Sequence, residues 1–195
     1  MDFLEEETDP TGIVFRDALF FMLLSLVVVI FLLTFLISPA AERTDQAPIR
    51  DEIVIEATWP TGSKYDIDLW GMGPDKRPVG WGVFSAGSIM NHERDDRGAV
   101  NDTSDLNYEV MTVRKREPGE YIINLHMYDT HKDPLPVPVL VKVVGKSGLG
   151  VIYSGQVLLE RSKEELTVVR FTLDVDGSLL RNSVNNLQYS ILSRR

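Results

Sequence analysis

An uninterrupted apolar run near the start of the chain limits what this sequence can fold into. Residues 18–37 contain only Ser25 and Thr34 as polar interruptions. A helix over such a run, at about 1.5 Å per residue, spans roughly 30 Å, the thickness of the hydrocarbon core of a bilayer. The run is too long for the apolar part of a cleaved signal and follows an acidic head. The sequence therefore predicts a transmembrane helix over residues 13–38, after a short tail of residues 1–12.

Two charged residues stand at the head of this run. Asp17 directly precedes the apolar residues and follows Arg16. A carboxylate at the membrane boundary is costly, and such groups often serve proton or ion pathways. The two residues also fit a role as interfacial anchors. Position alone therefore leaves two interpretations of Asp17 open, an ion-carrying residue and an anchor.

The rest of the chain changes from a helical to a twofold apolar period. Residues 39–50 are small and polar and contain prolines, which predicts a linker. After them, short segments rich in β-branched and aromatic residues alternate with turn signals such as Asp176-Gly177. The predicted strands cover residues 52–59, 66–72, 79–85, 108–114, 120–128, 137–144, 152–159 and 165–174. The predicted fold is mainly β: one transmembrane α-helix followed by a β-sandwich domain over residues 51–195.

Composition and motifs exclude several classes of function. A net charge of −9 gives no electrostatic footprint for nucleic acid. The absence of cysteine excludes disulfides and thiolate sites and suits a bacterial periplasm. The three histidines match no common zinc spacing, and neither a phosphate-binding glycine loop nor a nucleophile elbow is present. We therefore expect that the protein is not an enzyme and has no nucleic-acid partner.

A group of charged residues in the predicted β domain has two interpretations. The group is Asp66, Asp68, Arg94, Asp95 and Asp96. Asp66 and Asp68 share one face of a predicted strand. With Asp95 or Asp96 they would form an oxygen-rich set suited to a hard cation such as calcium. Alternatively, Asp66 and Asp68 accept hydrogen bonds from Arg94 or Arg97 and form a structural lock. The lock is the preferred interpretation, and no metal is firmly assigned.

The start of the apolar run resembles a known family. An aromatic residue, an acid two positions later and a long Leu/Val/Phe run are found at Phe15, Asp17 and Leu19. This pattern resembles the single-span subunits of the ExbD/TolR family and, more loosely, MotB. The resemblance implies that Asp17 is the ion-carrying carboxylate, with protons as the coupling ion and no other cofactor. The channel-facing candidates are Phe21, Leu24 and Ser25.

The same resemblance implies partners and a location. In that family a homodimer of such helices lies inside about five copies of a multi-span MotA/TolQ/ExbB-type channel subunit. The chain would lie in the bacterial inner membrane, with a cytoplasmic N-terminus and a periplasmic β domain. The β domain itself is similar to uncharacterised bacterial domains that carry a strand like Asp66-Ile67-Asp68-Leu69-Trp70, which implies no activity.

Two functions follow from these observations. The preferred one is a subunit of an ion-driven membrane motor or energy-transducing complex, whose β domain transmits force or binds a periplasmic target. The alternative is a membrane-anchored periplasmic binding or assembly module, whose helix is only an anchor.

Overall fold

The computed structural model describes residues 10–37, 52–85, 87–99 and 104–194. The chain divides into two compact units, Met1–Ala47 and Pro48–Arg195. The predicted linker, residues 39–50, and residues 1–9 of the predicted tail lie outside the described residues.

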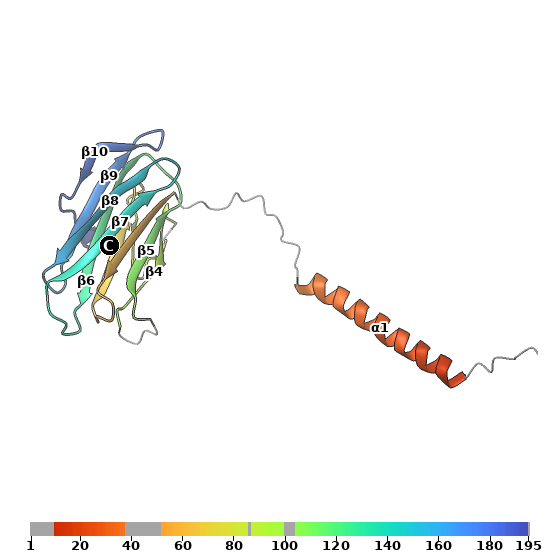
Figure 1. Ribbon diagram of the computed structural model, residues 1–195. Coiled ribbons are helices and arrows are strands. Elements are labelled where there is room, and N and C mark those ends of the chain that lie inside the picture. Colours follow the sequence, from red (N-terminus) through yellow and green to blue (C-terminus); the bar gives the residue numbers. More distant parts are fainter. Residues whose placement is uncertain (1–9, 38–51, 86, 100–103, 195) are drawn as a thin grey trace, which may run out of the picture. The chain divides into compact units, whose positions relative to one another are not determined.

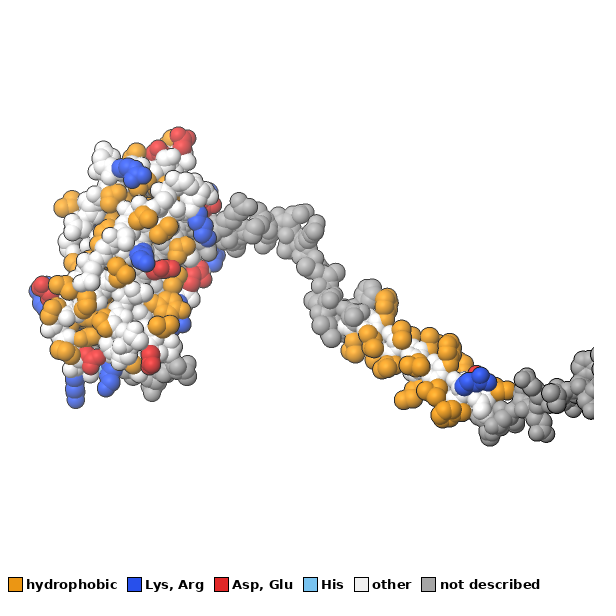
Figure 2. Space-filling model, viewed as in Figure 1, with side chains coloured by type: hydrophobic (Ala, Val, Ile, Leu, Met, Phe, Trp, Pro, Cys, Tyr) orange, Lys and Arg blue, Asp and Glu red, His pale blue; other side chains and the backbone are white. Residues whose placement is uncertain are grey.

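The first unit contains one long helix, α1, which spans Pro10–Ile37. Proline is tolerated at the first helical position, where its missing N–H has no partner to lose. Within α1, residues Gly12–Leu33 have a mean hydropathy of 2.5, long and apolar enough to cross a membrane. Signal sequences meet the same criterion. Figure 2 shows hydrophobic side chains along this helix, and the Ser25 hydroxyl donates to the carbonyls of Phe21 and Met22, each at 2.9 Å.

The second unit confirms the predicted β-sandwich. In the described part of this unit, two antiparallel five-stranded sheets face each other (Figure 1), with strand orders β4-β5-β1-β7-β8 and β10-β9-β6-β2-β3. We refer to them as sheet A and sheet B. The strands are β1 Ile53–Trp59, β2 Asp66–Met72, β3 Pro78–Val79, β4 Met90–Arg94, β5 Asn107–Val113, β6 Gly119–Asp129, β7 Val137–Gly145, β8 Gly150–Leu159, β9 Glu165–Leu173 and β10 Leu179–Asn185.

Alternating apolar residues build the core between the sheets. In β1, Ile53, Ile55 and Ala57 are buried while Glu56 and Thr58 are exposed. The valines at every second position of β7 are buried in the same way. Because successive strand side chains point to opposite faces, this alternation places one face of each strand in the core.

The outer face of sheet B carries a second, smaller cluster. Trp70, Met72 and Ile122 pack there with Ile191 from the C-terminal segment, which ends in a short 3₁₀-helix, η1, over Leu192–Arg194. The carboxylate of Glu165 fixes this segment by accepting hydrogen bonds from Ser190 Oγ at 2.6 Å and Ile191 N at 2.7 Å. The segment thus covers part of a sheet face that would otherwise expose large apolar side chains.

Three strand predictions need correction. The predicted strand 79–85 is wrong, because β3 ends at Val79 and a tight turn follows, in which Gly82 has a φ of 72°. β4 was not predicted, since polar residues interrupt its apolar alternation and its pairing shifts register between His92 and Arg94. β10 was also missed, because it is mostly solvent-exposed and pairs irregularly with β9.

Candidate functional site

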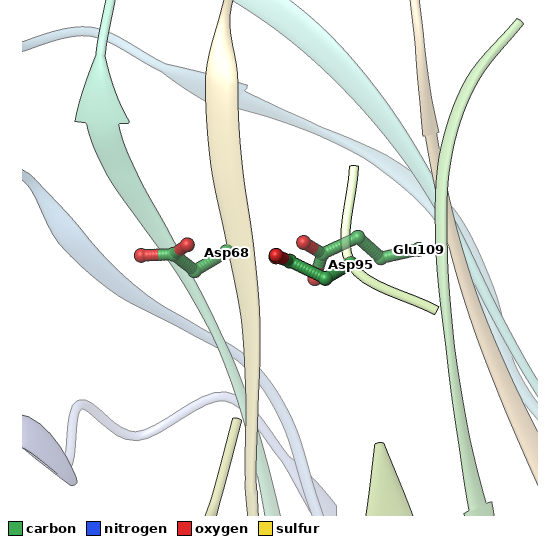
Figure 3. A group of neighbouring side chains, drawn as sticks. All are labelled: Asp68, Asp95 and Glu109. Carbon is green, nitrogen blue, oxygen red and sulfur yellow. The ribbon is translucent and has the colours of Figure 1, made fainter. Parts of the chain in front are cut away.

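Three carboxylates from different segments meet in the β unit. Asp68 lies on β2, Glu109 on β5 and Asp95 in the segment that follows β4. One oxygen from each lies within 4.8 Å of the others. Figure 3 shows the Asp95 and Glu109 carboxylates pointing toward β2, the strand that carries Asp68. We call these three residues the acidic cluster. Glu109 is fully buried, Asp68 is 5% exposed and Asp95 is partly buried, so two of the three residues are shielded from water.

Glu109 holds the cluster together by satisfying backbone groups. On β5 it shares the inward face with Met111 and Val113. Its carboxylate accepts hydrogen bonds from Leu69 N at 2.5 Å and Asp96 N at 3.4 Å. The short strand β3 pairs with β2 only at Gly71 and Met72, so Glu109 provides the partner that the Leu69 amide lacks.

Burial sets the protonation tendencies of Glu109 and its neighbour His92. Loss of water around the Glu109 carboxyl raises its pKa well above the ordinary value. Burial also lowers the pKa of His92, whose Nε2 lies 3.2 Å from Glu109 Oε2. The position therefore disfavours charge on both groups.

The other two carboxylates, Asp68 and Asp95, differ in their hydrogen-bond partners. Asp68 Oδ2 lies 3.0 Å from His126 Nδ1. Asp95 Oδ1 is buried and accepts no hydrogen bond from the part of the chain that the structure describes. A buried acceptor without a donor is uncommon, and a bound cation would satisfy it.

The structure pairs Arg94 with Asp96, whereas the predicted lock had Asp66 and Asp68 as the acceptors. Arg94 Nη2 donates to Asp96 Oδ2 at 3.0 Å, and the same carboxylate accepts from Tyr108 N at 3.2 Å and Gly98 N at 2.9 Å. Gly98 has a φ of 65°, and a Cβ there would lie 2.5 Å from the carbonyl oxygen of Tyr65. Asp96 thus fixes the turn, and Asp68 pairs with a histidine instead of the expected arginine.

Asp66 lies beside the acidic cluster and lines an adjoining pocket. The pocket has a volume of about 210 Å³ and is lined by Asp66, Asp68, Trp81, Arg97 and Tyr128. Burial, followed by the negative charges of Asp68 and Asp95, raises the pKa of Asp66 to about 6, while His131 and Arg97 oppose the shift. The pocket therefore has a negative electrostatic character on the side of β2.

The sequence located part of this site and missed the rest. Asp68 and Asp95 were named as possible ligands, and the structure brings them together. Glu109 was missed, although a lone acid at an inward-facing strand position is a usable signal. His92 and His126 were treated as ordinary, and both contact cluster carboxylates.

The candidates on α1 form no comparable site. Asp17, Phe21 and Leu24 are exposed on this helix, and the Ser25 hydroxyl is satisfied by backbone carbonyls. The channel-facing role predicted for Phe21, Leu24 and Ser25 stays a prediction.

Comparisons with known proteins give no family assignment. No family model matches the sequence, and no curated protein matches it. A crystal structure of a homologue of telluride resistance protein (TerD) from Streptomyces coelicolor A3(2) is similar at 15% identity and a TM-score of 0.47, covering 72% of this chain and 92% of that chain. A crystal structure of a protein of unknown function is similar at 14% identity and a TM-score of 0.45, covering 71% of this chain and 89% of that chain.

These findings contradict the motor-subunit interpretation. The chain's structural similarity is to the two proteins above, neither described as a motor subunit, and no family model supports the ExbD/TolR/MotB resemblance. The predicted family, the ion-driven function and the ion-carrying role of Asp17 that followed from it are therefore wrong. The resemblance came from a short motif on an apolar helix, and apolar helices resemble one another through composition alone. The predicted channel partner and dimer are untested and lose the support of that resemblance.

Proposed function

We propose that the β unit binds a hard divalent cation such as calcium, and that α1 anchors this unit to a membrane. The observation that carries the proposal is the acidic cluster, in which Asp68, Asp95 and Glu109 each place an oxygen within 4.8 Å of the others. Its ligands come from two strands and a turn that are far apart in the sequence, so the fold itself assembles the set.

Electrostatics favours a cation at this position. Where water is excluded, a carboxylate carries its charge only beside a compensating partner. Hydrogen bonds from Leu69 N and contact with His126 offset part of this cost. They leave the buried Asp95 Oδ1 without a donor among the described residues. A bound cation would provide the compensating charge and satisfy this oxygen at once.

The ligand chemistry selects the kind of cation. Carboxylate oxygens are hard ligands, which suit calcium or magnesium better than soft transition metals. Calcium takes 6–8 oxygens at irregular angles, whereas magnesium requires near-octahedral geometry. Three carboxylates of unequal burial, with remaining positions for water, fit the calcium requirement better. The imidazole of His92 is engaged with Glu109, which argues against a zinc site.

For the location, we propose a bacterial inner membrane with the β unit on the periplasmic side. A cysteine-free chain suits that compartment, and calcium sites of 10⁻⁴–10⁻³ M affinity are typical of extracytoplasmic modules. The basic residues weakly favour the opposite orientation, because Arg43 and Arg50 follow the apolar run while Arg16 alone precedes it closely. Direct labelling distinguishes the two orientations.

The cation site is tested by titrating the full chain in lipid nanodiscs with calcium and with terbium, a luminescent substitute for calcium. Trp81 lines the pocket that contains Asp68, so excitation of tryptophan should sensitise bound terbium. Calcium should displace terbium and quench the signal. Asp95→Asn should weaken terbium binding at least about tenfold, since it removes one charged ligand. Asp176→Asn, at an exposed turn aspartate outside the cluster, is the matched control and should leave binding unchanged.

Two results would refute the proposal. One is a wild-type chain that neither sensitises terbium nor gains thermal stability in millimolar calcium. The other is equal weakening of binding by Asp95→Asn and Asp176→Asn, which would indicate diffuse attraction to an acidic surface instead of a built site.

A further inference from the structure

An aromatic pair forms one wall of the pocket next to the acidic cluster. Trp81 and Tyr128 are 42% and 47% exposed. Their rings are stacked, with centroids 6.3 Å apart and an interplanar angle of 23°. The other two tryptophans, Trp59 and Trp70, are buried. Leaving large aromatic rings in water forgoes the free energy of their burial, so an exposed pair beside a pocket suggests a binding surface.

The fold holds Trp81 in place. It lies at the tip of a turn closed by Gly80 N to Val83 O at 3.1 Å and Val83 N to Gly80 O at 3.0 Å. Gly82 supplies the positive φ that the third residue of such a turn requires. A Cβ on Gly80 would lie 2.5 Å from the Trp70 ring, so this turn rests directly on a buried side chain. Trp81 is therefore presented by a packed turn.

Contacts with Lys163 and His126 hold Tyr128 in place. It lies on β6, and the ammonium group of Lys163 donates to its backbone carbonyl and sits 4.0 Å from its ring centroid. The ring of His126 meets it edge-on, with centroids 6.2 Å apart and an interplanar angle of 68°. These contacts keep the ring in one orientation, so little ordering is needed when a ligand binds.

The polar groups of the pocket decide which ligand fits. Asp66 and Asp68 offer acceptors, while the Arg97 guanidinium offers donors. An anionic ligand would be repelled by the two carboxylates. An ammonium ligand would use those carboxylates but leave the Arg97 donors unused and face its positive charge. A hydroxyl group both donates and accepts hydrogen bonds. A neutral ligand with several hydroxyls can therefore bond to the two carboxylates and to the guanidinium of Arg97.

The size of the pocket and its aromatic wall narrow the class of ligand further. A volume of about 210 Å³ is below the range of pockets for drug-sized molecules, and suits a single small ring. The electron-rich face of an aromatic ring attracts weakly positive C–H groups. A sugar ring has such an aliphatic face together with hydroxyls around its edge.

We propose that this pocket binds a neutral saccharide unit, with the sugar ring against Trp81 and its hydroxyls hydrogen-bonded to Asp66 and Arg97. The inference goes beyond the cation site and does not require a bound cation, although Asp68 borders both. An organic ammonium ion is the competing ligand, and the experiment separates the two.

The test uses the full chain in phosphatidylcholine nanodiscs, which avoids sugar-based detergents. Ligand-observed saturation-transfer NMR is recorded with N-acetylglucosamine, glucose and galactose, and with tetramethylammonium as the cationic probe, in calcium and in EDTA. At least one sugar should show saturation transfer in both buffers. Trp81→Ala should weaken this binding about tenfold. Phe84→Ala, which truncates an exposed aromatic residue outside the pocket lining, should leave it unchanged.

Further variants keep the test decisive. Trp81→Phe retains an aromatic face and should restore most of the binding, and Arg97→Gln, at an exposed side chain, should weaken it without loss of the fold. Because Trp81 is also the donor in the terbium assay, the cation site of Trp81→Phe is checked by the rise in melting temperature that calcium produces. This rise should match the wild type, so that this proposal and the cation site can be tested separately. The proposal is overturned if none of the three sugars binds, if Trp81→Ala and Phe84→Ala have equal effects, or if tetramethylammonium alone binds.

Discussion

Substitution of two adjacent aspartates, Asp95 and Asp96, should have very different effects on the stability of the β unit. Asp96 is 2% exposed and accepts hydrogen bonds from Arg94 Nη2, Tyr108 N and Gly98 N. Asp95 belongs to the acidic cluster and has a buried oxygen without a donor in the described part of the fold. We expect Asp96→Ala to destabilise the β unit strongly and Asp95→Ala to leave its stability in EDTA nearly unchanged.

The magnitude for Asp96→Ala comes from the donors it would leave unpaired. Each buried donor without a partner costs about 1–3 kcal/mol. Arg94 keeps a hydrogen bond to the Tyr108 carbonyl at 3.3 Å and is partly solvated, so the two backbone amides dominate the loss. Their sum is about 3 kcal/mol. For a unit of this size that corresponds to a fall in melting temperature of roughly 6–12 °C.

The assay is thermal unfolding of the full chain in nanodiscs, followed by tryptophan fluorescence. All three tryptophans lie in the β unit, so the signal reports on that unit alone. Asp95→Ala should shift the melting temperature in EDTA by less than about 2 °C, yet abolish the rise produced by calcium. An Asp96→Ala variant that melts with the wild type would refute the lock, and a calcium-induced rise that survives in Asp95→Ala would refute its role as a ligand.

Three further outcomes follow from the structure. In EDTA the free energy of unfolding should fall by about 1–2 kcal/mol as the pH rises from below 4 through about 6, because the pKa of Asp66 is about 6 in the folded state and ordinarily 3.8. Melting curves recorded in calcium should show a smaller fall. A membrane-impermeant maleimide added to spheroplasts should label Asp176→Cys, whereas Thr8→Cys should react only after permeabilisation; the reverse pattern would place the β unit in the cytoplasm. Gly80→Ala should cost about 1–3 kcal/mol in chemical denaturation, since its Cβ would overlap the Trp70 ring; unchanged stability would contradict the packed turn.

Local sequence patterns were a sound guide to the elements and a poor guide to the family. The apolar run at residues 18–37 and the twofold alternation in β1 and β7 reflect burial at single positions, and each can be read from a short window. The motif at Asp17 is equally short, but family membership needs agreement over a whole domain. A helix whose composition is set by lipid matches many unrelated helices, so this motif was weak evidence of function.

The sequence by itself determined an apolar N-terminal helix and a β-sandwich unit, because hydrophobicity and its period act residue by residue along the chain. It also showed that Asp66 and Asp68 share a face. Only the tertiary structure decided that Asp95 and Glu109 join Asp68, that Asp96 takes the arginine, and that Trp81 stands beside Tyr128. These contacts join β2, β5, β6 and the turns around β4 across two sheets, and they depend on strand order and register. Local periodicity carries no information about which strands become neighbours, so the site could emerge only from the packed fold.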